Sequence, residues 1–155
     1  MKRTILCLLF VCFCSYKVSG QEHHVNLIIQ INDKLIVDGL QEIYIKTDSI
    51  ESERIYVKYV PGDLILTDSV FNLLNSENTE SFKLYFGYAT HDKRKSEYAY
   101  FSVGLSKQIF SLPYLILNVY DFRDKKYRKW YQSYTKDDFL VERISPNSGV
   151  YIRNH

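Results

Sequence analysis

FKLYFGYAT at residues 82–90 and EYAYFSVGL at residues 97–105 flank a polar segment, HDKRKS, at residues 91–96. In both flanking segments alternate side chains are apolar, which is typical of a half-buried β-strand, and the polar residues between them indicate a hairpin loop at His91–Ser96. With Thr90 opposite Glu97, the apolar partners are Tyr88 and Ala99, Phe86 and Phe101, Leu84 and Val103, and Phe82 and Leu105. A slip of one residue would turn every side chain to the other face. The segment therefore predicts an antiparallel hairpin with one buried face.

The other face of this hairpin is rich in tyrosine. It carries Lys83, Tyr85, Gly87, Tyr98, Tyr100 and Ser102, and the register predicts that Tyr100 lies over Gly87. Tyrosine joins a large apolar ring to a polar hydroxyl, and contiguous exposed aromatic side chains mark partner or ligand sites. Tyrosine-rich strand faces are therefore the main candidates for a binding surface.

Further short strands are expected on both sides of the hairpin, because β-branched and aromatic residues recur in short runs between turn signals. The predicted strands are Val25–Ile31, Leu40–Thr47, Arg54–Val60, Phe82–Thr90, Glu97–Leu105, Tyr114–Phe122, Tyr127–Tyr134, Phe139–Ile144 and Val150–Arg153. One short helix is predicted at Ser69–Leu74, capped by Asp68. The pattern favours an all-β fold, an antiparallel two-sheet β-sandwich of the immunoglobulin-like or transthyretin-like kind with one short helix.

A second hairpin is predicted around a loop at Arg123–Lys126. Its register sets Val119 against Trp130, which predicts a core face, and pairs Asp121 with Arg128. The reverse face carries Asn118, Tyr120, Phe122, Tyr127, Lys129 and Tyr131. If this face is open, it is a partner-binding strip. The alternative is that a second sheet, a loop or a helix covers it, so that its tyrosines belong to the core.

The Asp38-Gly39 dipeptide is a strong hairpin signal in isolation. A turn there would pair Val37 with Leu40 and then set Leu35 against Glu42. Apolar and charged side chains would alternate across such a ladder, so we expect this hairpin to be short.

The first twenty residues have the features of a cleavable secretory signal peptide. Lys2 and Arg3 are positive, Ile5–Cys14 is an apolar run, and Val18 and Gly20 are small enough for signal peptidase. About ten apolar residues are too few for a permanent membrane span, which needs about 20. A lipid anchor is disfavoured, because no small residue directly precedes Cys12 or Cys14. We expect residues 1–20 to be removed and residues 21–155 to form a single domain.

Composition after this cleavage narrows the class of protein. All three cysteines lie within residues 1–20, so residues 21–155 can form no disulfide. Lys2, Arg3 and Lys17 are lost, which leaves 17 basic against 18 acidic residues and makes nucleic acid an improbable partner. The absence of cysteine and of Asn-x-Ser/Thr sequences favours the bacterial envelope, either the periplasm or the cell surface.

Catalytic and cofactor motifs are absent from the sequence. His91 is expected in a solvated loop with no nucleophile in a strained turn nearby. The carboxylates of Asp121 and Asp124 are expected to be exposed, whereas acid–base catalysis requires one carboxyl in a buried setting. No cofactor is predicted.

One metal site is conceivable at the new N-terminus. After cleavage, Gln21, His23 and His24 could offer an amine, backbone amides and imidazoles to Cu(II) or Ni(II) in a square plane. An N-terminal Gln readily cyclises and would then lose the amine, so such binding would be adventitious.

The basic segment Arg123–Lys129, next to Trp130, could meet lipid phosphates or an acidic partner. Lysines with solvated ammonium groups around a turn are the simpler interpretation, so membrane association is expected to be weak.

These observations favour an exported, non-enzymatic protein of the bacterial cell envelope that recognises a protein or a glycan through an aromatic strand face. The alternatives are a small envelope hydrolase that places His91 and a carboxylate in a deep pocket, and a structural or inhibitory envelope protein.

Overall fold

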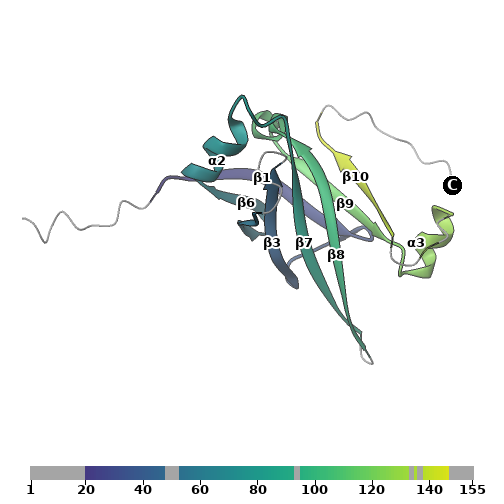
Figure 1. The fold of residues 1–155 in the computed structure, drawn as a ribbon. Coiled ribbons are helices and arrows are strands. Elements are labelled where there is room, and N and C mark those ends of the chain that lie inside the picture. Colours follow the sequence, from purple (N-terminus) through teal and green to yellow (C-terminus); the bar gives the residue numbers. More distant parts are fainter. Residues whose placement is uncertain (1–19, 48–52, 93–94, 133–134, 136–137, 147–155) are drawn as a thin grey trace, which may run out of the picture.

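Two β-sheets packed face to face account for most of the chain in the computed structural model (Figure 1). The structure describes residues 20–47, 53–92, 95–132, 135 and 138–146, and the side chains of residues 90–97 are not among those described. The predicted two-sheet β-sandwich is confirmed. Residues 1–19 of the predicted signal peptide, with the three cysteines, and the predicted strand Val150–Arg153 lie outside the described residues.

The larger sheet, sheet A, is built around the long strand β1. Its order is β10 (Phe139–Ile144), β9 (Leu115–Asp121), β1 (Glu22–Ile31), β6 (Gly62–Thr67) and β5 (Lys58–Val60), with β2 (Lys34–Leu35) also paired to β1. Strands β1 and β9 are parallel, and every other described pair in this sheet is antiparallel. The prediction of antiparallel sheets therefore holds with one exception at the centre of sheet A.

The smaller sheet, sheet B, contains the hairpin predicted from the sequence. Its order is β4 (Ile55–Tyr56), β3 (Leu40–Thr47), β7 (Ser81–Asp92) and β8 (Lys95–Ser106). The predicted register is confirmed throughout, from Phe82 opposite Leu105 to Thr90 opposite Glu97. The loop is shorter than predicted, because the pairing continues through His91 and Ser96 to Asp92 and Lys95.

Tight turns fix the registers at one end of sheet A. Asn32 and Asp33 both have positive φ (54° and 62°) and join β1 to β2, as a type I′ turn requires. Pro61 and Gly62 join β5 to β6, and the positive φ of Gly62 (93°) suits the third position of a type II turn.

The Asp38-Gly39 dipeptide does not close a local hairpin. Leu40 pairs with Tyr88 in sheet B, whereas Lys34 and Leu35 pair with β1 in sheet A. The dipeptide thus lies in the connection between the two sheets, and the short hairpin expected there is wrong because its two flanking segments pair with different sheets.

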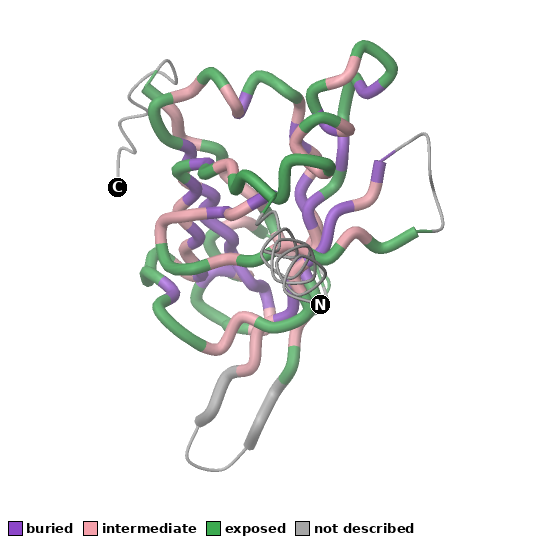
Figure 2. The backbone as a smooth tube through the Cα atoms, turned by 90° about the vertical axis from the view of Figure 1, so that its left-hand side faces the viewer, coloured by how far each residue is buried: buried purple, intermediate pink, exposed green. Residues whose placement is uncertain are grey.

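The core lies between the sheets. Strands β1 and β9 contribute Leu27, Ile29, Leu117 and Val119, all fully buried, and sheet B contributes Ile45, Leu84, Phe86 and Phe101. Figure 2 shows the buried residues along the strands where the sheets face each other, and the exposed residues mainly in the connections. The alternation of apolar side chains in the sequence thus corresponds to the inward-facing positions.

Helix α2 (Asp68–Asn75) closes one end of the sandwich and confirms the helix predicted at residues 69–74. Its N-cap is Thr67, whose hydroxyl accepts a hydrogen bond from the Val70 amide at 3.5 Å. The predicted cap, Asp68, is instead the first helical residue, where its charge favours the helix dipole. Leu74 is buried in the core.

Strand β6 was not anticipated, although Leu64 and Leu66 are fully buried. These two residues alternate within a segment of only six residues that lies between the Pro61-Gly62 turn and α2. A 3₁₀ helix, η1 (Lys107–Ser111), follows β8 and buries Ile109.

The second predicted hairpin is wrong, because residues 125–130 form helix α3 (Lys125–Trp130) rather than a strand. Asp124 caps this helix, with its carboxylate accepting a hydrogen bond from the Lys126 amide at 2.9 Å. Strand β9 pairs with β1 on one side and with β10 on the other, which leaves no edge for a hairpin partner. Trp130, predicted to be core, is 51% exposed.

No helix in the described part of the chain is long and apolar enough to span a membrane.

Candidate functional site

The predicted partner-binding strip on residues 118–131 is not an open surface. Asn118, Tyr120, Phe122 and Tyr127 are buried, Tyr131 is half-buried, and among the six residues of the strip only Lys129 is exposed. Helix α3 folds over the outer side of β9, which places Tyr127 and Tyr131 on Tyr120, with ring centroids 5.5 Å and 4.9 Å apart. The alternative interpretation, that a helix covers this face, is therefore the correct one.

A polar network ties the buried strip to the β1–β2 turn. The Asn118 amide donates to Asp33 Oδ1 at 2.7 Å and to the Tyr120 hydroxyl at 2.9 Å, and that hydroxyl donates to Glu142 at 2.9 Å. The Tyr127 hydroxyl donates to the carbonyl oxygen of Asn32 at 2.8 Å. Buried polar atoms that are satisfied in this way stabilise one arrangement of the chain. The network is structural.

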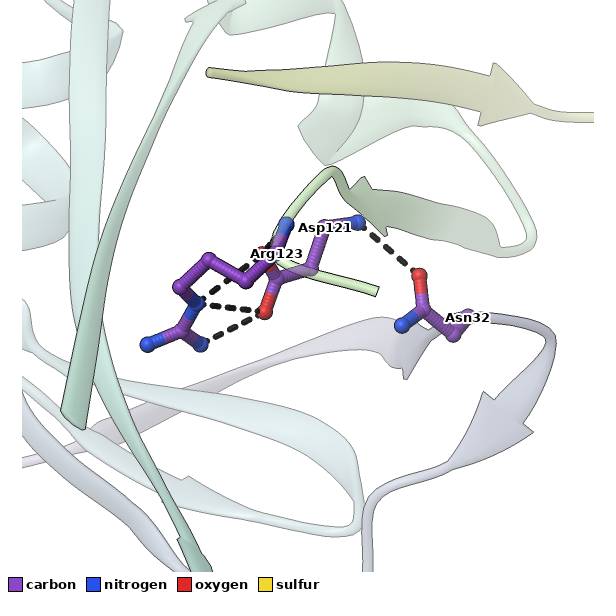
Figure 3. A network of polar contacts seen from close by, with 3 residues as sticks. All are labelled: Asn32, Asp121 and Arg123. Atoms are coloured by element: carbon purple, nitrogen blue, oxygen red, sulfur yellow. Dashed lines mark hydrogen bonds and ion pairs between the residues drawn. The ribbon is translucent and has the colours of Figure 1, made fainter. Parts of the chain in front are cut away.

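An ion pair fixes the turn that leads into α3 (Figure 3). The Arg123 guanidinium binds both carboxylate oxygens of Asp121 at 2.5–3.0 Å, and Asn32 Oδ1 accepts from the Asp121 amide at 2.9 Å. Asp121 is only 7% exposed. The sequence-based expectations of an exposed Asp121 and of its pairing with Arg128 are both wrong, because the chain turns at Asp121 and brings Arg123 back onto it.

The predicted metal ligands at the N-terminal end are separated by the strand that carries them. His23 and His24 are successive residues of β1, so their side chains lie on opposite faces. His23 bonds Asp68 at 2.8 Å and stacks on Phe71 at 3.9 Å, whereas His24 bonds Asp63 at 2.6 Å. Gln21 precedes β1 and is exposed. The two imidazoles therefore do not converge on one ion.

A set of five tyrosines lies on the outer side of sheet B, and we refer to it as the tyrosine face. It comprises Tyr44, Tyr56, Tyr85, Tyr98 and Tyr100. The register places the first three side by side on β4, β3 and β7, because Tyr44 is opposite both Tyr56 and Tyr85. Across four strands spaced about 4.8 Å apart, the face spans about 15 Å.

The rings of the tyrosine face contact one another in two groups. Tyr44 stacks on Tyr85 with centroids 4.9 Å apart and planes within 6°, and it also contacts Tyr56 at 5.9 Å. Tyr98 and Tyr100 meet edge to face at 4.7 Å. Tyr56 (64%), Tyr100 (54%) and Tyr98 (38%) are exposed, whereas Tyr44 is buried beneath its neighbours. Tyr44 and Tyr85 thus form the packed part of the tyrosine face, and Tyr56, Tyr98 and Tyr100 form its exposed part.

A β-bulge in β3 brings a carboxylate to this face. The β3–β7 register shifts between Gln41 and Tyr44, and Glu42 within the shift has a positive φ of 50°. Its carboxylate accepts a hydrogen bond from the Tyr100 hydroxyl at 2.8 Å. This bond and a second one with Tyr98 raise the pKa of Tyr100 above its ordinary value. β-Bulges commonly redirect a side chain at functional sites. Non-glycine residues with positive φ, such as Glu42, are also concentrated at functional sites.

Gly87 makes room for Tyr98 within the tyrosine face. A Cβ on residue 87 would lie 1.8 Å from the Tyr98 hydroxyl oxygen and 2.4 Å from Cζ. Tyr100 is directly opposite Gly87, as predicted, but the ring that covers the glycine is that of Tyr98, which reaches it diagonally from two residues along β8.

Basic side chains border the tyrosine face next to β4 and along β3 and β7. Arg54 lies over the Tyr44 ring at 4.9 Å, and hydrogen bonding to Tyr56 raises the pKa of its guanidinium, which keeps it charged. Lys46 and Lys83 are directly opposite each other in the next cross-strand pair. Both lysines add positive charge beside the tyrosines.

The sequence identified part of this face. Tyr85, Tyr98 and Tyr100 followed from the hairpin register, whereas Tyr44 and Tyr56 did not, because their position depends on the pairing of β3 with β7 and β4. The alternation of Tyr44 with Ile43 and Ile45 was the only local signal available.

Catalytic geometry does not appear in the described residues. His91 pairs with Ser96 at the far end of β7, and its side chain is outside the described set. No group of three or more His, Cys, Asp or Glu side chains in the described part of the chain is arranged to hold a metal ion.

Comparisons with protein-family models, with curated proteins and with solved structures gave no match to this chain.

Proposed function

We propose that this protein is an exported, non-enzymatic binding protein of the bacterial cell envelope, and that it recognises a protein or a glycan through the tyrosine face. The observation that carries the proposal is the position of five tyrosines on the outer side of sheet B, three of them exposed to solvent. The binding surface proposed here is on sheet B, whereas the strip predicted from the sequence is on sheet A.

Three features support a binding role for this face. Exposed Tyr56, Tyr98 and Tyr100 offer ring area together with hydroxyl groups, a combination enriched at interfaces. Stacking fixes the rings of Tyr44 and Tyr85 before a ligand binds, so binding costs little side-chain entropy there. The span of about 15 Å matches four to five residues of an extended peptide, or a short run of sugar rings.

The first experiment uses purified protein without residues 1–20 as bait. It is immobilised and exposed to envelope extract and to a panel of polysaccharides. A variant carrying Tyr56→Ser, Tyr98→Ser and Tyr100→Ser is treated in parallel. We expect the wild type to retain a ligand and the variant to lose it. Interface energy concentrates in aromatic side chains such as tyrosine, so a loss of about 1 kcal/mol or more is expected for each of the three.

The matched control is Tyr114→Ser, which removes a 40% exposed tyrosine located outside the tyrosine face. It should fold and capture the ligand like the wild type. Circular dichroism and a denaturant midpoint confirm that the triple variant remains folded. Equal capture by the wild type and a folded triple variant would refute the proposed function.

A further inference from the structure

Helix α3 presents a second surface, on the other sheet from the tyrosine face. Four of its six residues are basic, namely Lys125, Lys126, Arg128 and Lys129. The chain as a whole has a formal net charge of only +2, and without residues 1–20 it has 17 basic against 18 acidic residues. The positive charge on α3 is therefore a local concentration. Figure 1 shows the helix at the periphery of the molecule, beside the end of β9 and away from sheet B.

The cations of α3 are largely unneutralised by neighbouring acids. Arg123 forms an ion pair with Asp121, which neutralises its charge. Within the described residues no ion pair joins Lys125, Lys126 or Lys129 to a carboxylate. Asp124 lies next to them, with its carboxylate accepting from the Lys126 amide as the helix cap. A net positive surface remains.

An exposed indole accompanies these charges. Trp130, the only tryptophan of the chain, is 51% exposed at the last residue of α3. The Lys126 ammonium lies over its ring at 4.4 Å. A large aromatic with a polar edge beside lysines is the combination that membrane–water interfaces favour, because the ring enters the headgroup layer while the ammonium groups bind phosphates.

The helix is held rigidly enough to act as a docking element. Tyr127, 4% exposed, donates its hydroxyl to the Asn32 carbonyl oxygen and packs on Tyr120. One side of α3 is thereby fixed to sheet A. Binding therefore does not require the helix to form, which lowers its entropic cost.

We propose that α3 is a peripheral docking site for an anionic lipid bilayer, in which Trp130 enters the headgroup region and Lys125, Lys126 and Lys129 contact the lipid phosphates. Charge complementarity selects an anionic partner, and the half-exposed indole selects a partner with an apolar boundary. A bilayer of anionic lipid has both properties, whereas a soluble polyanion has only the first. This surface is separate from the tyrosine face and can bind while that face is occupied.

The test uses vesicles of phosphatidylcholine alone and of phosphatidylcholine with phosphatidylglycerol. Because Trp130 is the only tryptophan, its emission reports this site alone. We expect the protein to co-sediment with the anionic vesicles and not with the neutral ones, with a blue shift of the emission. Lys125→Gln, Lys126→Gln and Lys129→Gln together should lower the partition constant about 100-fold.

A matched variant changes three exposed lysines elsewhere: Lys58→Gln, Lys83→Gln and Lys107→Gln. It has the same net charge as the α3 variant and should bind nearly as the wild type does. Trp130→Ser should weaken sedimentation while leaving the fold intact. An equal loss in both triple variants, equal binding to neutral vesicles, or tight binding to soluble polyphosphate without binding to vesicles would overturn the proposal.

Discussion

The ring of Tyr98 covers Gly87 on the outer face of sheet B. The phenol of Tyr98 fills the space that any side chain on residue 87 would need, since its hydroxyl oxygen lies 1.8 Å from the position of a Cβ there. The backbone of Gly87 has no positive φ that would require glycine. The requirement for glycine is therefore imposed by the tyrosine ring, and a packing of this kind is known to offset the weakness of glycine within a strand.

The first prediction follows from this overlap. In Gly87→Ala the new methyl group displaces the Tyr98 ring, whose far end can swing towards solvent. Stability should change by less than about 1 kcal/mol, because the ring is already partly exposed. Nuclear Overhauser contacts between the Tyr98 ring and the α protons of residue 87 should be present in the wild type and lost in the variant.

Binding by the tyrosine face should weaken in the same variant, although none of the five tyrosines has been changed. Ser102→Ala provides the control, since it alters the outer face of β8 without touching Gly87. Retention of the Tyr98 contacts in Gly87→Ala would show that the ring does not cover the glycine.

The second prediction concerns Tyr120, which was first expected in an open strip and is 1% exposed. Tyr120→Ser should lower the free energy of unfolding by about 3–5 kcal/mol, as for other large buried aromatics. Tyr120→Phe keeps the ring but leaves Asn118 and Glu142 without their shared partner, at a cost of about 1–2 kcal/mol. Urea denaturation measures the stability of both variants. A negligible effect of Tyr120→Ser would indicate that Tyr120 is exposed on an open strip, as predicted from the sequence.

How far the fold follows from the sequence is shown by the two predicted hairpins. The Phe82–Leu105 hairpin is local, and only one register buries a complete apolar face, so it could be predicted residue by residue. The segment Tyr127–Tyr134 is less clear, because its residues are compatible with a strand and with a helix. Its aromatic residues favour a strand by residue type, but Tyr127, Trp130 and Tyr131 have the i, i+3, i+4 spacing of one helix face.

Whether residues 125–130 form a helix or a strand is decided by pairings between segments that are distant in the sequence. Strand β9 is occupied on one side by β1, which lies nearly 90 residues earlier in the chain, and on the other by β10. A parallel pairing over that separation leaves no mark in the local pattern. The same reason hides the tyrosine face, since Tyr44 and Tyr56 join it only through the pairing of β3.

The third prediction addresses Trp130, the residue for which the expectation of burial was wrong. Trp130→Ala should lower the free energy of unfolding by less than about 1 kcal/mol, because half of the side chain is already in solvent. Phe86→Ala, at a fully buried position, should cost about 3–5 kcal/mol in the same assay. Similar losses in the two variants would mean that the indole is part of the core.

The last prediction uses the buried phenol beneath α3. Burial raises the pKa of Tyr127, and the nearby Asp33 carboxylate raises it further. The phenol is therefore neutral to a higher pH in the folded state than in the unfolded chain, where it ionises near 10.0. Below that pH the phenol is protonated in both states, so its contribution to stability is fully present and does not change with pH. As the pH rises above about 10, the unfolded chain releases the proton first, and stability falls.

Urea midpoints measured from pH 8 to pH 11 should thus decline at the alkaline end, and Tyr127→Phe should decline less steeply, since it has no phenol to ionise. Tyr114→Phe, at an exposed position, controls for the other tyrosines and should follow the wild type. Lysine titration is common to all three proteins and cancels in the comparison. Parallel curves for the wild type and Tyr127→Phe would show that the Tyr127 hydroxyl is in contact with solvent, and hence that α3 does not seal the outer face of β9.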